Sequence, residues 1–223
     1  MTRRMILPLL FGLAGCAILI GLGLWQVQRL AWKQDILAQI SARLNDTPVP
    51  LPAAPDPAAD KYLPVSTAGR FTGPQIDVLV STKGAGAGYR IISAFQTADG
   101  RKIMVDRGFL PADQRAHPRT ATAATITGTL HWPAEVDSFT PPPDPAENIW
   151  FARDVPAMAA ALGTELVLIV ARTDTGDGII PLPVDTAGIP NNHLNYAVTW
   201  FSLAAVWLGM TLLLLWRIRR RTV

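Results

Sequence analysis

The sequence predicts an α+β membrane protein in which two transmembrane helices, one N-terminal and one C-terminal, flank a small antiparallel β-rich extracytoplasmic domain. Two observations predict the helices and a third predicts the domain. Residues 5–28 and 194–216 contain no charged side chain, and about 20 apolar residues suffice to cross a bilayer as a helix. Between the two runs, short strand-like segments alternate with glycine and proline turns.

The first apolar run predicts an N-terminal tail at residues 1–5 and a transmembrane helix at residues 6–28. Residues 29–45 are expected to continue this helix, because Ile36, Leu37, Ile40 and Leu44 recur at helical spacing. Residues 46–60 form a linker. Five prolines between residues 47 and 57 exclude a helix or a central strand there and favour an extended spacer.

Residues 61–192 are expected to form the β-rich domain. The predicted strands cover residues 63–71, 75–81, 90–96, 102–107, 125–131 and 165–171, with breaks at Gly73-Pro74, residues 84–88, Asp99-Gly100 and residues 108–111. Short strands at this spacing are typical of a small antiparallel sheet or barrel. A helix is expected at residues 156–162, capped by Asp154 and ended by Gly163.

The second span is expected at residues 193–216, followed by a basic tail at 217–223. Six of the 20 basic residues lie in the two tails, whereas all 17 acidic residues lie between the spans. Basic residues favour the cytoplasmic side, so both termini are expected in the cytoplasm and the domain in the periplasm. No Arg- and Ser-rich transit peptide precedes the first span, which favours a bacterial inner membrane. This charge distribution does not indicate nucleic-acid binding.

Cys16 permits two interpretations of the first span. Leu13-Ala14-Gly15-Cys16 resembles the end of a lipoprotein signal, after which the cysteine would carry a lipid anchor. However, residues 17–25 remain apolar, which favours a continuous anchor helix. A single cysteine also excludes a disulfide within the chain.

The predicted domain holds few candidates for chemistry. The glycine-rich residues 84–88 precede a strand-like segment rather than a helix, so a hairpin loop is favoured over a nucleotide site. Asp106 and Arg107 are expected to have an internal structural role rather than to act as a functional charge pair. His117 and His131 are isolated, without metal-site spacing. These observations do not favour an enzyme.

The chain resembles the Surfeit-locus family of cytochrome c oxidase assembly proteins. The motifs that carry the resemblance are LGLWQVQR at residues 22–29, Trp32-Lys33, Gly88-Tyr89, residues 105–111, residues 148–151 and PNNHLNYAVTWF at residues 190–201. Phe109 departs mildly, since many members have Trp there. The resemblance implies a non-enzymatic factor that binds haem a and helps to deliver it to oxidase subunit I. It also implies haem a synthase and the lipid bilayer as partners.

Bacterial members of the family are similar in binding haem a through the histidine of the last motif, here His193. On a helix, one stripe would carry His193, Tyr196, Ala197, Trp200 and Ala204. We expect the small alanines to leave room for a flat apolar ring against Gly21 and Gly23 of the first span. Neutral imidazole is a common iron ligand.

The expected haem site comprises His193 as iron ligand, with Tyr196, Trp200, Trp25 and Arg29 beside it. Arg29, together with Lys33, would pair with the haem propionates. Alternatives remain open for each residue. The aromatic side chains also suit anchors at the membrane interface, the cations also suit lipid headgroups, and a histidine at an interface can simply cap its helix. A cofactor-free scaffold for an oxidase intermediate is the alternative function.

Overall fold

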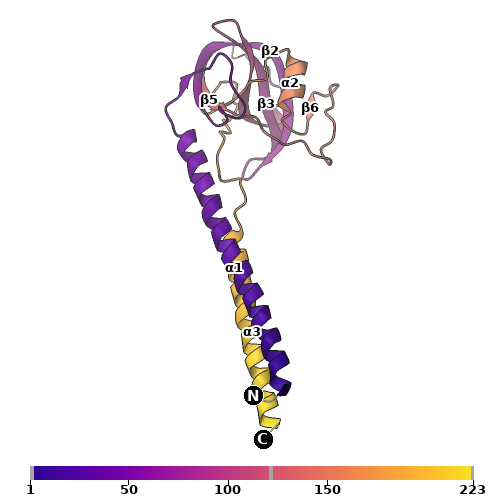
Figure 1. The fold of residues 1–223 in the computed structure, drawn as a ribbon. Coiled ribbons are helices and arrows are strands. Elements are labelled where there is room, and N and C mark those ends of the chain that lie inside the picture. The colour runs from indigo at the N-terminus through magenta and orange to yellow at the C-terminus, as the bar shows by residue number, and fades with distance from the viewer. Residues whose placement is uncertain (1–2, 121–122, 222–223) are drawn as a thin grey trace. The chain divides into compact units, whose positions relative to one another are not determined.

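The structure is a computed structural model that describes residues 3–120 and 123–221. Residues 1–2 of the expected N-terminal tail and 222–223 of the expected basic tail lie outside the described residues. Residues up to Gln39 and from Thr186 onward form one compact unit, and Ile40–Asp185 form the other. The first unit holds two long helices, and the second holds a β-rich domain (Figure 1).

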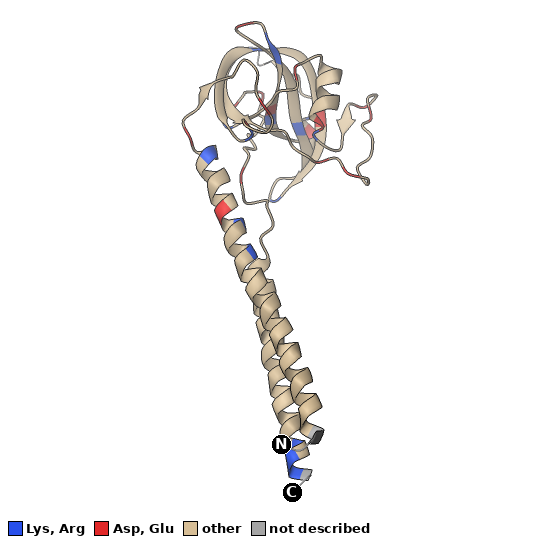
Figure 2. Cartoon of the chain, in the orientation of Figure 1, with Lys and Arg blue, Asp and Glu red and all other residues tan. Residues whose placement is uncertain are grey.

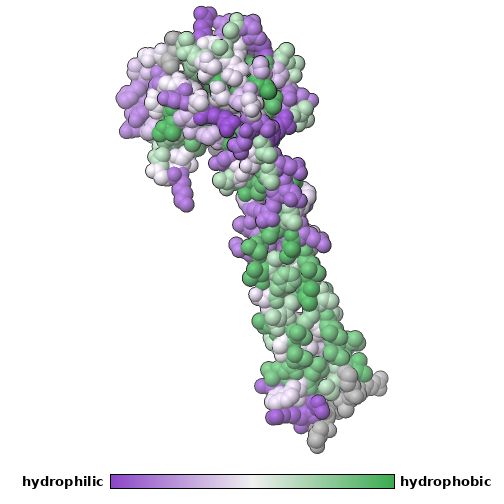
Figure 3. Space-filling model, turned by 90° about the vertical axis from the view of Figure 1, so that its left-hand side faces the viewer, coloured by the Kyte–Doolittle hydropathy of each residue, from purple (hydrophilic) through white to green (hydrophobic). Residues whose placement is uncertain are grey.

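Helices α1 (Arg3–Leu44) and α3 (His193–Arg221) are each long and apolar enough to cross a membrane. Apolar side chains cover most of their visible surface (Figure 3). Charged residues are absent from the middle of the helix pair and cluster toward its ends (Figure 2). Helix α1 also covers residues 32–44, for which the apolar spacing predicts a helix. The fold class predicted from the sequence, two apolar helices flanking a β-rich domain, is confirmed.

The two long helices pack through small residues. A Cβ atom added to Gly12 would lie 2.2 Å from Thr211 Cγ2, and one added to Gly15 would lie 2.3 Å from Trp207 Nε1. Small residues permit this close approach, and the resulting van der Waals contact holds helices together in lipid, where no hydrophobic effect does so. Cys16 lies in the same contact, with Sγ 3.8 Å from the carbonyl oxygen of Ala204. Its burial in the middle of α1 supports the anchor-helix interpretation over the lipid-modified cysteine.

Among its described residues, the second unit contains seven strands and, beyond the end of α1, one α-helix. The strands are β1 (Val49–Pro50), β2 (Pro64–Thr82), β3 (Gly86–Thr97), β4 (Lys102–Pro111), β5 (Ala123–Leu130), β6 (Ile149–Trp150) and β7 (Leu168–Ala171). A short 3₁₀ helix, η1, covers Ala112–Gln114, and helix α2 covers Val155–Leu162. The hydrogen-bonded order is β1-β2-β3-β4-β7-β5. Since β5 also pairs with β2, strands β2, β3, β4, β7 and β5 close into a barrel.

The longest strand pairs are antiparallel, as the sequence predicts, but the sheet as a whole is mixed. Strand β7 runs parallel to β4, and the short strands β1 and β6 run parallel to β2. A parallel pair needs a long crossover connection. Here the chain passes through β5, β6 and α2 between β4 and β7, which supplies that connection.

Two expected strand breaks are bulges instead. The predicted strands at 63–71 and 75–81 form the single strand β2, whose pairing with β3 shifts register between Phe71 and Gln75. Gly73, at a φ of 100°, and Pro74 form this bulge, which bends the strand without ending it. Strand β4 likewise runs through Gly108, whose φ is 115° and whose added Cβ would lie 2.1 Å from the carbonyl oxygen of Ile180.

The domain core has two layers. Inside the barrel pack Val65, Phe71, Phe95, Ile103, Val105, Ile126, Leu130, Val167, Ile169 and Ala171. A second cluster joins α2 to the outer face of the sheet through Met158, Ala159 and Val155 against Ile92, Met104 and Leu168. The caps of α2 agree with the sequence prediction: Asp154 accepts from the Ala157 amide, and Gly163 ends the helix at a φ of 63°.

Candidate functional site

His193 and Gln26 form a polar pair between the two long helices. His193 is the first residue of α3, and Gln26 lies in α1 with only 8% of its surface exposed. His193 Nδ1 lies 2.7 Å from Gln26 Oε1. Because an amide oxygen can only accept a hydrogen bond, Nδ1 is the donor in this arrangement. Polar groups in apolar spans pair with one another, and this contact satisfies that requirement.

The hydrogen bond leaves the second ring nitrogen available. In a neutral imidazole with its hydrogen on Nδ1, the lone pair is on Nε2. Within the described part of the chain, no hydrogen bond to His193 Nε2 is formed. Histidines that bind metals donate their other ring N–H to an oxygen acceptor, which fixes the tautomer and the ring orientation. The contact of His193 Nδ1 with Gln26 is therefore of the kind that metal-binding histidines also make.

Gln26 is the residue that sequence analysis missed. The signal was present: Gln26 is one of two glutamines within the charge-free residues 5–28, and it lies three residues after Gly23 on the small-residue face of α1. Gln28, by contrast, is exposed. A buried polar side chain on a helix contact face needs a partner from the other helix, and His193 is that partner.

The structure brings together only some of the predicted site residues. Trp25 is 55% exposed and Tyr196 56% exposed, so both rings lie on outer faces of the helices rather than in their contact. Trp200 is half-buried. The Arg29 guanidinium stacks 3.8 Å above the Trp32 ring. Among the predicted residues, His193 alone has a polar partner on the opposite helix.

The expected space beside the small residues is closed. Ala197 is 2% exposed and Ala204 7% exposed, because α1 lies directly against them. Gly23 packs on the Phe201 ring, whereas Gly21 has no atom within 4 Å of its added Cβ. Small side chains on both helices let the backbones approach, which removes the gap expected from their size.

Asp106 and Arg107 are structural, as expected, but they do not pair with each other. Adjacent residues of a strand point to opposite faces. Asp106 is fully buried and accepts from Arg90 Nε at 2.5 Å and Arg153 Nη1 at 3.1 Å. On the other face, Arg107 donates to Asp177 at 2.7 Å. Burial lowers the pKa of Arg107, and the contact with Asp177 opposes this.

The remaining candidates in the domain have structural settings. Residues 83–85 form the turn of the β2–β3 hairpin, which agrees with the hairpin interpretation, but residues 86–88 already belong to β3, so the loop is shorter than the expected 84–88. His117 is exposed. His131 stacks on Tyr62, with ring centres 5.5 Å apart, and burial lowers its pKa to about 4, aided by the charges of Arg153 and Lys61. Among the described residues, no group of three His, Cys, Asp or Glu side chains is placed to hold a metal ion.

Comparison with known proteins extends over most of the chain. Residues 13–205 match the SURF1 family. The chain is 30% identical over 209 residues to Surfeit locus protein 1 of Rattus norvegicus, which covers 83% of this chain and 68% of the relative. It is 31% identical to Surfeit locus protein 1 of Homo sapiens, over 83% of this chain and 70% of the relative. It is 34% identical to the SURF1-like protein of Monosiga brevicollis, over 85% and 80%. The chain belongs to the SURF1 family.

Proposed function

We propose that this protein is a non-enzymatic assembly factor for cytochrome c oxidase that binds haem a through His193 and assists its delivery to oxidase subunit I. The oxidase and haem a synthase enter as partners through the resemblance of its motifs to the Surfeit-locus family. The observation that carries the haem proposal is the hydrogen bond between His193 Nδ1 and Gln26 Oε1. It holds the imidazole with Nε2 free, and Nε2 is the atom proposed to bind the iron.

The proposed haem position lies against the helix pair at the level of His193. The contact face between the helices is filled by Ala197 and its neighbours, so the porphyrin is proposed to lie on the outer surface. Tyr196 exposes its ring one helical turn from His193, and Trp25 adjoins Gln26 in the sequence. Exposed aromatic rings at this depth are suited to contact an apolar macrocycle.

Arg29 is the proposed partner of a haem propionate. It lies one helical turn after Gln26 on α1, just beyond the charge-free residues 5–28. Its guanidinium is already ordered over the Trp32 ring. An ordered guanidinium loses little further freedom when it binds a carboxylate, and the bond is charge-assisted.

The proposed location is a bacterial inner membrane with both termini in the cytoplasm and the β-rich domain in the periplasm. The support is the distribution of basic residues, which are concentrated in the short tails beyond both spans. This orientation places His193 and Arg29 at the periplasmic surface.

The test measures haem bound to protein purified from cells that make haem a. The wild type is expected to carry haem a with a histidine-ligated spectrum, and His193→Ala is expected to lose it. Gln26→Leu is expected to retain less haem, by roughly 10- to 100-fold in affinity, because the ring loses its orienting acceptor. Gln28→Leu is the matched control, since it removes an exposed glutamine two residues away.

Full haem content in His193→Ala would overturn the ligation. Equal losses in Gln26→Leu and Gln28→Leu would overturn the orienting role of Gln26. A colourless wild-type protein from cells with abundant haem a would favour the alternative function, a cofactor-free scaffold that stabilises an oxidase intermediate. The close contact of Ala197 and Ala204 with α1 supports this alternative, because helices that pack directly against each other need no cofactor between them.

A further inference from the structure

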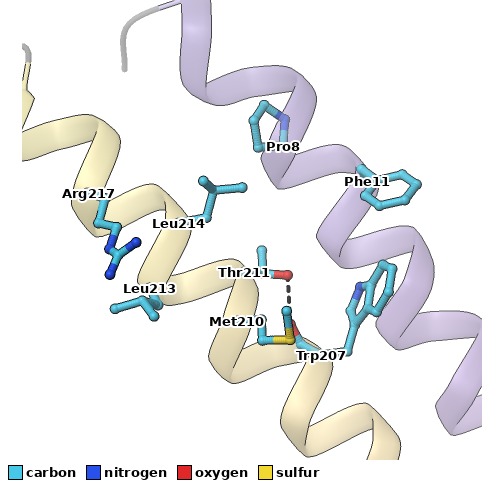
Figure 4. A pocket seen from close by; sticks show the side chains of 8 residues that line it. All are labelled: Pro8, Phe11, Trp207, Met210, Thr211, Leu213, Leu214 and Arg217. Carbon is cyan, nitrogen blue, oxygen red and sulfur yellow. Dashed lines mark hydrogen bonds between the residues drawn. The ribbon is translucent and has the colours of Figure 1, made fainter.

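A groove lies between α1 and α3 at the end of the pair that carries the chain termini. It has a volume of about 340 Å³. Pro8 and Phe11 contribute from α1, and the other side chains come from α3 (Figure 4). The lining residues are Pro8, Phe11, Trp207, Met210, Thr211, Leu213, Leu214 and Arg217.

The groove is lined mostly by apolar side chains, and its two neutral polar side chains already have hydrogen-bond partners. The Trp207 indole N–H donates to the carbonyl of Gly12 at 3.1 Å, and the Thr211 hydroxyl donates to the carbonyl of Trp207 at 2.8 Å. The Phe11 ring lies against the Trp207 ring, with centres 5.3 Å apart. Arg217 is the charged residue among those that line the groove.

The dimensions of the groove match one leaflet of a membrane. Trp207 and Arg217 are ten residues apart on α3, which corresponds to about 15 Å along the helix axis. Half of a hydrocarbon core is about 15 Å. The groove therefore extends from the charged boundary at Arg217 to about the bilayer midplane at Trp207.

We propose that this groove is a binding site for one anionic phospholipid. An acyl chain lies along Pro8, Phe11 and Trp207, and the phosphate contacts the Arg217 guanidinium. Lipids with net negative charge are favoured, because basic pockets between transmembrane helices attract anionic headgroups and each cation near the surface contributes about 1 kcal/mol. The bound lipid would lie beside the close contact of Gly12 with Thr211.

This site is separate from the proposed haem site. His193 lies 18 residues before Thr211 on α3, which corresponds to about 27 Å of helix. Lipid binding in the groove and haem binding at His193 can therefore be measured independently, and failure of one leaves the other standing.

The experiment measures lipid retention by the full-length protein. The protein is purified in detergent with added phosphatidylglycerol or phosphatidylcholine of identical acyl chains, and bound lipid is counted by native mass spectrometry. We expect phosphatidylglycerol to be retained about five-fold more strongly, the factor that corresponds to about 1 kcal/mol. Arg217→Gln is expected to reduce phosphatidylglycerol retention to the level of phosphatidylcholine. Met210→Trp is expected to lower retention of both lipids by filling the groove.

Two matched variants serve as controls. Arg220→Gln removes the same charge from the same tail, but Arg220 stacks on Trp216 and does not line the groove. Leu212→Trp adds the same bulk to an exposed position of α3 outside the groove. Both are expected to retain lipid as the wild type does. Equal retention of the two lipids by the wild type, or an equal loss in Arg217→Gln and Arg220→Gln, would overturn the proposal.

Discussion

The helix pair and the β-rich domain bury polar groups in opposite ways. In the domain, Asp77, Asp106 and Arg107 are nearly or fully buried, each in an ion pair with a residue distant in the sequence. In the helix pair, Gln26 is the buried polar side chain among the described residues, and it pairs with the His193 ring. The charged groups buried in the domain thus pair within the domain, whereas the buried amide between the apolar helices pairs with the residue proposed to bind haem.

The largest expected effect is that of breaking an ion cluster in the domain. Asp106→Asn removes the charge that Arg90 and Arg153 share, so the largely buried Arg90 loses its ion-pair partner, whereas Arg153 keeps its pair with Glu135. Breaking a buried pair in this way costs about 3–5 kcal/mol. Urea unfolding of the full chain in detergent, followed by near-ultraviolet circular dichroism, measures the change. Glu165→Gln is the control, because the Glu165 carboxylate is itself 42% exposed, and it is expected to cost less than about 1 kcal/mol.

The next effect depends on pH and concerns His131. Its pKa is about 4 in the folded protein and 6.5 in the reference state, so the unfolded chain binds the proton more tightly. Above pH 6.5 the titration of His131 does not lower the free energy of unfolding. As the pH decreases from 6.5 toward 4, this free energy falls by at most roughly 3 kcal/mol. His131→Phe keeps a ring beside Tyr62 and is expected to flatten this dependence in pH-dependent melting curves. The exposed His117, changed to Gln, should leave the slope as in the wild type.

In the helix pair, added bulk tests how closely the helices approach. Gly23→Leu places atoms where the Phe201 ring lies, since even a Cβ would be 2.6 Å from that ring. Overpacking of this kind costs about 1–3 kcal/mol. Gly21→Leu is the control: it makes the same substitution two residues earlier on α1, where an added Cβ has no atom within 4 Å. Thermal unfolding in detergent is expected to show a lower melting temperature for Gly23→Leu alone, and equal melting would contradict the close packing.

The smallest effect on stability is expected from Gln26→Leu. Hydrogen bonds between transmembrane helices contribute about 0.6 kcal/mol on average, so the melting temperature should change little. The same variant is expected to lose haem strongly, as proposed above. A large loss of stability together with an unchanged haem content would reverse the contrast between the two regions, because Gln26 would then be structural.

Local patterns in the sequence predicted much of the fold. The charge-free runs indicate both long helices, and Asp154 and Gly163 mark the ends of α2 through local capping chemistry. The bulge at Gly73-Pro74 was predicted as a break, because glycine and proline signal both features and only the pairing partner distinguishes them. The parallel pairing of β7 with β4 also depends on contacts distant in the sequence.

The sequence by itself determined the two apolar helices and the stretch of chain that forms the β-rich domain, and it singled out His193 as a candidate, because hydropathy, turn residues and motifs act over short stretches of chain. Only the tertiary structure decided that Gln26 is the partner of His193, that the alanines close the helix contact, and that Asp106 and Arg107 face separate ion clusters. The reason is that hydrogen-bond partners and close packing are set by which surfaces meet, and residues 167 positions apart meet only after the chain folds.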